Sequence, residues 1–203
     1  MIAMQAFSRG LMGLAMVGAI MLAATASAAP RHYVVDEEHV SVAFRAGHAR
    51  FADVIGLFTE VRGAFVYDPA TQALVSGHAE VAADSVFTGH EGRDEHVRDG
   101  DFLAAGEHPI IRFDATGYQP VGETGGTLDG ELTIRGVTRP VSLEVEINRL
   151  DAHPIGGAET LGASMRGSLQ RSDFGMDYAL EGDLVSDRIE LLIEFEAIRA
   201  DDE

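Results

Sequence analysis

The chain has 203 residues, of which 33 are Asp or Glu and 15 are Arg, and it contains neither Lys nor Cys. Its net charge of −18 repels nucleic acid and anionic membrane surfaces, which excludes both as expected partners. Because the acidic residues are dispersed, they indicate a solubilising surface. Without Cys there is no disulfide framework, so stability has to come from burial and strand pairing.

The N-terminal residues have the layout of a secretory signal peptide. Arg9 precedes an apolar run over 11–24, and small residues at Ala26 and Ala28 fit a cleavage site before Ala29. The run is about 14 residues long, short of the roughly 20 that span a bilayer. We therefore expect residues 1–28 to be removed near Ala28, and residues 29–203 to form a single periplasmic domain without a permanent membrane anchor.

Apolar and polar residues alternate in successive stretches from residue 40 onward, which is typical of half-buried strands. Residues rich in turn signals, such as Gly, Asp and Pro, separate these stretches. Strands with one apolar face must hide that face and protect their edges, which favours a closed antiparallel barrel over the alternative, a two-sheet sandwich. The stretches are 40–46, 61–67, 75–81, 111–115, 128–134, 141–147, 161–170 and 189–196.

Two segments depart from this alternation. Residues 48–58 place apolar side chains at helical spacing, which predicts a short helix. Residues 89–107 are polar, with Val97 and Phe102 as apolar anchors, and predict a short helix or a long loop. Either segment could cover a barrel mouth. Near the other end of the chain, Arg171 to Gly175 is interpreted as a strand that ends in a tight turn, for which glycine supplies the free backbone.

Five motifs stand in a recognisable order along the chain. They are Phe44 and His48 with 54–58 and Gly63; 84–88; 93–97 with 101–102 and 108–113; 130–141; and 171–176. In this set the chain resembles the YceI family of polyisoprenoid-binding proteins, from about His32 to Arg199.

The resemblance implies an extended, lipocalin-like antiparallel barrel of eight strands with short helical segments near its mouth. It also implies an internal channel that holds a polyisoprenoid chain, such as a quinone tail, or a similar long amphiphile. Family members are commonly exported and commonly dimeric, so a homodimer is a possible state. The implied roles are lipid transport, storage or a stress response.

The expected lipid contacts are apolar side chains from inward strand positions and from the motifs. For any single one of them, simple core packing is the commoner role. Gly63, Gly77 and Gly130 stand at strand positions that are expected to face the barrel interior. There they either leave room for a ligand or mark strand bends. The candidate contacts are Val42, Phe44, Phe51, Val54, Phe58, Phe65, Phe102, Ile111, Phe113, Leu132, Ile134, Leu143, Phe174, Leu191 and Ile193.

The alternative hypothesis is a metal-binding or hydrolytic protein that uses Arg93, Asp94 and His96, with His48 nearby. A His beside a carboxylate can act as a general base, but no Cys or Gly-x-Ser-x-Gly motif supplies a nucleophile. A purely structural role accounts for the same residues, in which an ion pair between Arg93 and Asp94 holds the loop in place.

The His residues show no H-x-H or H-x-x-x-H spacing, although His90 and His96 flank the acidic loop and could form an incidental zinc site. We expect no catalytic residue, no metal and no cofactor. A pure interaction protein, whose loop docks a membrane component, is a third reading that the residues leave open.

Overall fold

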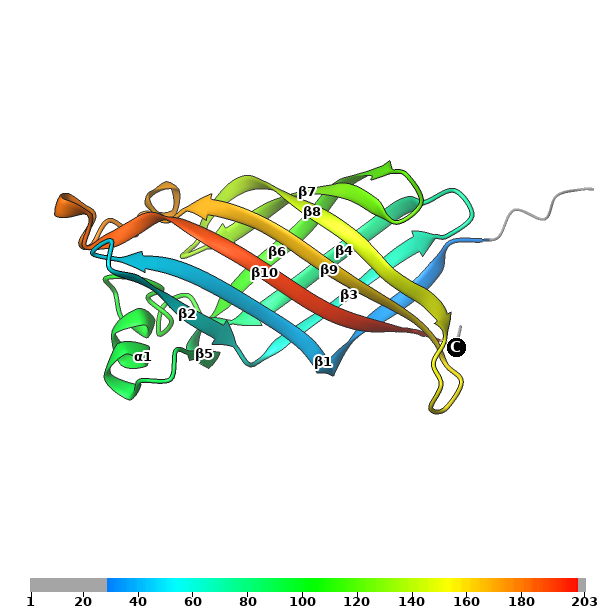
Figure 1. The fold of residues 1–203 in the computed structure, drawn as a ribbon, viewed down its shortest axis with the longest axis horizontal. Helices are drawn as coiled ribbons and strands as arrows, with labels where there is room; N and C mark the ends of the chain where they lie inside the picture. Colours follow the sequence, from blue (N-terminus) through cyan, green and yellow to red (C-terminus); the bar gives the residue numbers. More distant parts are fainter. Residues whose placement is uncertain (1–28, 201–203) are drawn as a thin grey trace, which may run out of the picture.

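Long antiparallel strands close into one barrel in the computed structural model, which describes residues 29–200 (Figure 1). The expected eight-stranded barrel is confirmed, and the sandwich alternative is wrong, because β10 pairs with β1 and leaves no open edge between them. The expected signal peptide, 1–28, lies outside the described residues. The barrel strands are β1 (Arg31–His48), β3 (Val61–Asp68), β4 (Ala73–Ala82), β6 (Ile110–Val121), β7 (Gly125–Ile134), β8 (Val137–Ala152), β9 (Glu159–Gln170) and β10 (Val185–Arg199).

Strand β1 organises the closure. It has 18 residues and pairs with β10 along one edge. Its other edge pairs with β3 through residues 31–34 and with β2 (Ala52–Phe58) through residues 42–48. The register with β10 shifts between Val35 and Val40, which marks a bulge. Beyond β2 lies the two-residue strand β5 (Val86–Phe87).

The helix expected over 48–58 is wrong, because residues 52–58 form strand β2. Ala49 and Arg50 turn the chain with φ of 49° and 60°, and β2 then runs back along β1. Its apolar residues occupy both faces, with Phe58 inside and Ile55 outside. Apolar residues on both faces of a short strand imitate helical spacing, so spacing alone could not separate the two.

One end of the barrel carries the short helices (Figure 1). The helix expected within 89–107 is confirmed as α1 (Glu91–Arg98), which begins after His90, whose imidazole accepts a hydrogen bond from the Arg93 N–H. The 3-10 turns are η1 (Ala83–Ser85), η2 (Arg171–Phe174) and η3 (Glu181–Asp183). The expected turn after β9 is confirmed, since η2 ends at Gly175 with φ of 74°. No helix in residues 29–200 is long and apolar enough to span a bilayer.

The buried core is divided between the two ends of the barrel. At the α1 end, Val86, Leu103, Ile134 and Phe174 belong to one cluster. At the opposite end, a second cluster consists of Tyr33, Tyr67, Leu161, Ala163 and Ala197. Inward residues between them, including Val42 and Ile193, are only partly buried. The middle of the barrel is therefore not filled by its own side chains.

A hydrogen-bonded carboxylate joins β1 to β9 at the second cluster. The Tyr33 hydroxyl and the Arg31 guanidinium each donate to Glu159, both at 2.7 Å. Burial raises the pKa of the fully buried Tyr33 to about 12, so the phenol remains a donor. Burial alone would raise the pKa of Glu159, but the bonds from Tyr33 and Arg31 outweigh it and hold that pKa below its usual value.

We predict that Tyr33→Phe lowers the free energy of unfolding by about 1 kcal/mol at pH 7, because it removes one hydrogen bond to a carboxylate. A carboxylate whose pKa is lower in the folded state than in the unfolded state stabilises the folded protein. This stabilisation is complete at pH values above the unfolded-state pKa and is lost as the pH falls through the folded-state pKa. The difference from wild type, measured by urea unfolding, should therefore shrink at acid pH.

Tyr118→Phe is the matched control, since the Tyr118 hydroxyl donates to the backbone carbonyl of Gly125 and not to a carboxylate. Its cost should not change over the same pH range. An equal cost of Tyr33→Phe at pH 7 and at acid pH would contradict the role given to Glu159.

Candidate functional site

An apolar cavity of about 600 Å³ occupies the barrel interior. All eight barrel strands and β2 contribute side chains to its wall. The volume lies within the range of small-molecule sites in proteins. Along β8 the wall residues are Val141, Leu143, Val145 and Ile147, and along β10 they are Val185, Ile189, Leu191, Ile193 and Phe195. The alternation read from the sequence therefore identifies the cavity side of both strands.

The structure brings together all but two of the expected contact residues. Those that line the cavity are Val42, Phe44, Val54, Phe58, Phe65, Phe102, Ile111, Phe113, Leu132, Ile134, Leu143, Leu191 and Ile193. Whether they touch a lipid stays a prediction.

Phe51 and Phe174 do not line the cavity, which corrects their expected position. Phe51 lies in the turn between β1 and β2 with 94% of its surface exposed. Phe174 is 2% exposed and packs in the core cluster beside Leu103 and Met176. Neither residue belongs to a strand, so the alternation of inward and outward side chains could not predict where they point.

Several wall residues were missed by sequence reasoning. Tyr67 and Tyr118 contact each other edge to face at 6.4 Å near the end opposite α1. Tyr178 and Leu184 come from the segment between η2 and β10. Tyr67 continues the alternation of β3, which was a usable signal. Tyr178 and Leu184 lie outside any strand, and only the folded position of their segment brings them to the wall.

Phe44 and Phe113 are among the wall aromatics that lie against a glycine of the neighbouring strand, as Tyr118 does against Gly126. A Cβ on Gly56 would lie 2.2 Å from the Phe44 ring, and a Cβ on Gly130 would lie 2.2 Å from the Phe113 ring. The missing side chains let both rings lie close against the neighbouring strand. Gly130 therefore accommodates Phe113, whereas Gly77 itself lines the cavity and Gly63 packs against the His78 carbonyl.

Polar groups gather at the α1 end of the cavity. Arg171 is 2% exposed and donates to the backbone carbonyls of Val185 and Ser186, both at 2.9 Å, and to that of Met176. Its guanidinium carbon lies 5.6 Å from the centre of the Phe102 ring. Burial lowers the pKa of Arg171, although Asp187 and Asp177 oppose this shift. Arg171 thus fixes the segment that closes this end.

The charged side chains of the cavity wall are all cationic. Arg62 and Arg93 accompany Arg171, and His48, His78 and His96 add imidazoles. Within the described part of the chain, no Asp or Glu lines the cavity, although the whole sequence contains 33 of them. The wall is therefore apolar along the barrel and offers N–H donors, but no carboxylate, to a guest.

The loop of the hydrolytic hypothesis is held together by Thr88. Arg93 donates to the Thr88 hydroxyl at 2.7 Å and to its carbonyl at 2.8 Å. Asp94 accepts from the Thr88 N–H at 2.7 Å and from its hydroxyl at 2.5 Å. The bonds from Thr88 hold the pKa of Asp94 below its usual value. The expected direct ion pair between Arg93 and Asp94 is thus replaced by a shared contact with Thr88.

His96 is also engaged. Its Nε2–H donates to Asp101 at 3.0 Å, and its ring meets Phe102 and Tyr178 edge to face at 5.1 and 5.0 Å. Among the described residues, His90 and His96 belong to no group of three metal-donor side chains. These contacts engage Arg93, Asp94 and His96 with their neighbours at the α1 end of the barrel.

Comparisons with known proteins agree with this geometry. A UPF0312 protein of Yersinia enterocolitica is 33% identical over 196 residues, covering 96% of this chain and 99% of that relative. A Campylobacter jejuni YCEI protein of known structure is 30% identical, with a TM-score of 0.70, covering 76% of this chain and 90% of that one.

A polyisoprenoid binding domain from Saccharophagus degradans shares the fold, with a TM-score of 0.62 at 14% identity, over 83% of this chain and 98% of that domain. The model of the YceI-like domain matches residues 33–197, which is nearly all of the described barrel. The chain therefore belongs to the YceI family.

Proposed function

We propose that the protein is a periplasmic lipid carrier that holds a polyisoprenoid chain in its barrel and performs no chemistry on it. The observation that carries this proposal is the apolar cavity of about 600 Å³ enclosed by all eight barrel strands. The structural neighbour that binds polyisoprenoid has the same fold, which supports the class of guest. A quinone tail or a similar long amphiphile suits the apolar lining of the wall.

Burial of the chain supplies the affinity. Each methylene moved from water into an apolar site contributes about 0.8 kcal/mol. Ten buried carbons therefore reach roughly 8 kcal/mol before the costs of ordering and association are subtracted. Polar contacts are not needed for binding along the strands. At the α1 end, Arg93 and Tyr178 line the cavity and offer donors to the oxygen atoms of a head group.

Export is the part of this proposal that rests on sequence alone. The leader expected over 1–28 would deliver the barrel to the periplasm, where a water-soluble carrier is needed for a lipid that crosses between membranes. The dispersed acidic surface suits such a carrier because it opposes retention on anionic membranes. Transport, storage and a role in stress all fit this arrangement.

The first experiment is to purify the protein from its native cell envelope, extract it with organic solvent and analyse the extract by mass spectrometry. We expect one apolar isoprenoid lipid to be recovered in near-stoichiometric amount. A protein that yields no lipid, and that also fails to bind added ubiquinone or polyprenol, would overturn the proposal.

A matched pair of substitutions on β1 tests the location of the guest. Ala46 lines the cavity, whereas Ala43 pairs with Leu57 and Leu192, which are partly exposed on the outer face. We predict that Ala46→Phe obstructs the channel and weakens quinone binding by on the order of tenfold or more, because it displaces buried methylenes. Ala43→Phe adds the same side chain outside the barrel and should leave binding unchanged.

Fluorescence titration with a quinone, after circular dichroism has shown that both variants are folded, measures this difference. Equal binding by the two variants would place the guest outside the barrel.

The hydrolytic alternative is tested by the role of Asp94. The bonds from Thr88 predict that Asp94→Ala lowers the free energy of unfolding by about 1–3 kcal/mol at pH 7, because it leaves donors unpaired. The lowered pKa of Asp94 means that this contribution is complete above the unfolded-state pKa and disappears as the pH falls through the folded-state value.

Glu95→Ala, one residue further along α1 and exposed, is the control and should change stability by less than about 0.5 kcal/mol. Urea unfolding at two pH values measures both variants. An Asp94→Ala protein as stable as wild type would remove the structural explanation and return Asp94 to consideration as a catalytic group.

A further inference from the structure

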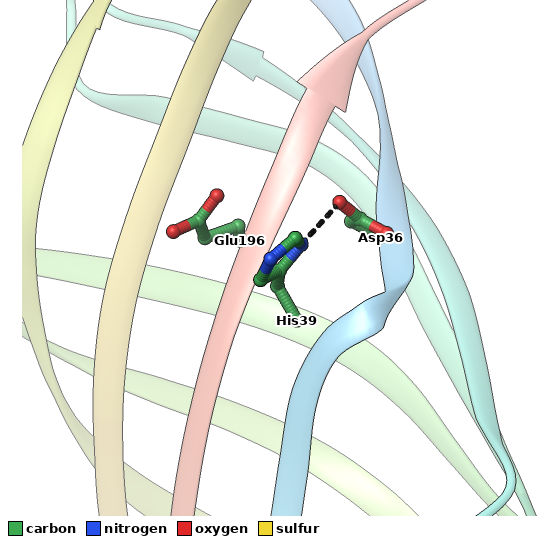
Figure 2. A group of neighbouring side chains, drawn as sticks. All are labelled: Asp36, His39 and Glu196. Atoms are coloured by element: carbon green, nitrogen blue, oxygen red, sulfur yellow. Dashed lines mark hydrogen bonds and ion pairs between the residues drawn. The ribbon is translucent and has the colours of Figure 1, made fainter. Parts of the chain in front are cut away.

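The bulge in β1 gathers metal-donor side chains on the outside of the barrel. Val35 pairs with Ala197 of β10 and Val40 pairs with Phe195, so residues 36–39 lie opposite Glu196 alone. As a result, one ligand atom from each of Asp36, His39 and Glu196 lies within 4.8 Å of the others. Figure 2 shows the His39 ring over β10 between the two acidic side chains, with its Nδ1 2.8 Å from Asp36 Oδ2.

A fourth donor comes from the loop between β8 and β9. The Nε2 atom of His153 lies 4.0 Å from Glu196 Oε2. Its Nδ1 lies 2.8 Å from the Ile155 carbonyl oxygen and 3.2 Å from the Ile155 backbone nitrogen, so Nδ1 faces both an acceptor and a donor, and the ring hydrogen can sit on either ring nitrogen. When Nδ1 carries the ring hydrogen, it donates to this carbonyl, and Nε2 presents a lone pair toward Glu196. Metal-binding histidines commonly donate their second nitrogen to a carbonyl in this way.

We propose that Asp36, His39, Glu196 and His153 form a surface site for Zn²⁺. Two imidazole nitrogens and two carboxylate oxygens make a donor set that suits tetrahedral Zn²⁺. In such a site neighbouring ligand atoms stand roughly 3.3 Å apart, so rotations of exposed side chains would bring these four groups into place. Ca²⁺ and Mg²⁺ prefer oxygen donors throughout, which makes them poor guests for this set.

The charges around the site favour a cation. The ion-pair partners that the structure gives for Asp36 and Glu196 are imidazoles, whereas other surface carboxylates, such as Glu80 and Glu159, pair with Arg. A metal that binds here displaces the proton shared by a carboxylate and an imidazole into solvent, and no arginine pair has to break. The site is also separate from the cavity, because none of its four residues lines the wall.

The metal would join three segments that meet only in the folded barrel. Asp36 and His39 belong to the β1 bulge, Glu196 to β10 and His153 to the loop after β8. A ligand that binds the folded state and not the unfolded chain raises the thermal midpoint. Zn²⁺ should therefore bind in a ratio of one per chain and also stabilise the protein.

The experiment titrates untagged, chelator-treated protein with ZnCl₂ by calorimetry and follows thermal unfolding with and without the metal. We expect one Zn²⁺ per chain and a higher melting temperature. His39→Ala and Glu196→Gln should each lower the affinity on the order of tenfold or more and abolish the thermal shift. His153→Ala should also weaken binding, and unchanged affinity in that variant would overturn the four-ligand set.

The double variant His90→Ala/His96→Ala is the control, because it removes the two imidazoles near α1 and leaves the bulge intact. It should bind Zn²⁺ like the wild type. Loss of binding in this control, wild-type affinity in His39→Ala, or no saturable binding to the wild type would each overturn the site. Because His39 is exposed, His39→Ala should fold, and circular dichroism together with a His39→Gln variant checks this.

Discussion

The pairing of β1 with β10 is the constraint on which the rest of the molecule depends. It turns a chain of antiparallel strands into a closed wall, so that the inward side chains of every barrel strand face one enclosed space. Without this pairing, two long strand edges and the apolar inner face would meet water. Closure also explains how a chain without Cys remains ordered, because each barrel strand has a hydrogen-bonded neighbour on both sides.

Closure alone does not leave a cavity, since a barrel of eight strands can be filled by its own side chains. Here the larger buried groups lie at the ends, with the Tyr33 cluster at one end and the cluster around Phe174 at the other. Phe44 and Phe113 pack against the Phe174 cluster and lie close against glycines of neighbouring strands. Apolar volume is thereby concentrated where it closes the barrel and kept small where a guest would lie.

Sequence reasoning was most successful where a strand period of two fixed the facing of side chains. It predicted the eight barrel strands and most of the wall, because alternation and the inward face are the same property. It failed for β2, whose apolar residues lie on both faces. It also failed for Phe51 and Phe174, which lie outside the strands and so have no inward or outward face to predict. It also could not find the donor group at Glu196, because that group depends on a register shift between β1 and β10.

The bulge has a geometric cause that connects this surface to the cavity. Val35 and Val40 both line the cavity, yet they are separated by an odd number of positions and would face opposite sides of a regular strand. Their partners on β10, Ala197 and Phe195, are two positions apart and share a face. The extra residues of β1 must therefore leave the ladder, and those residues, 36–39, are all polar. The same irregularity that keeps the wall apolar thus places Asp36 and His39 beside Glu196 on the outside.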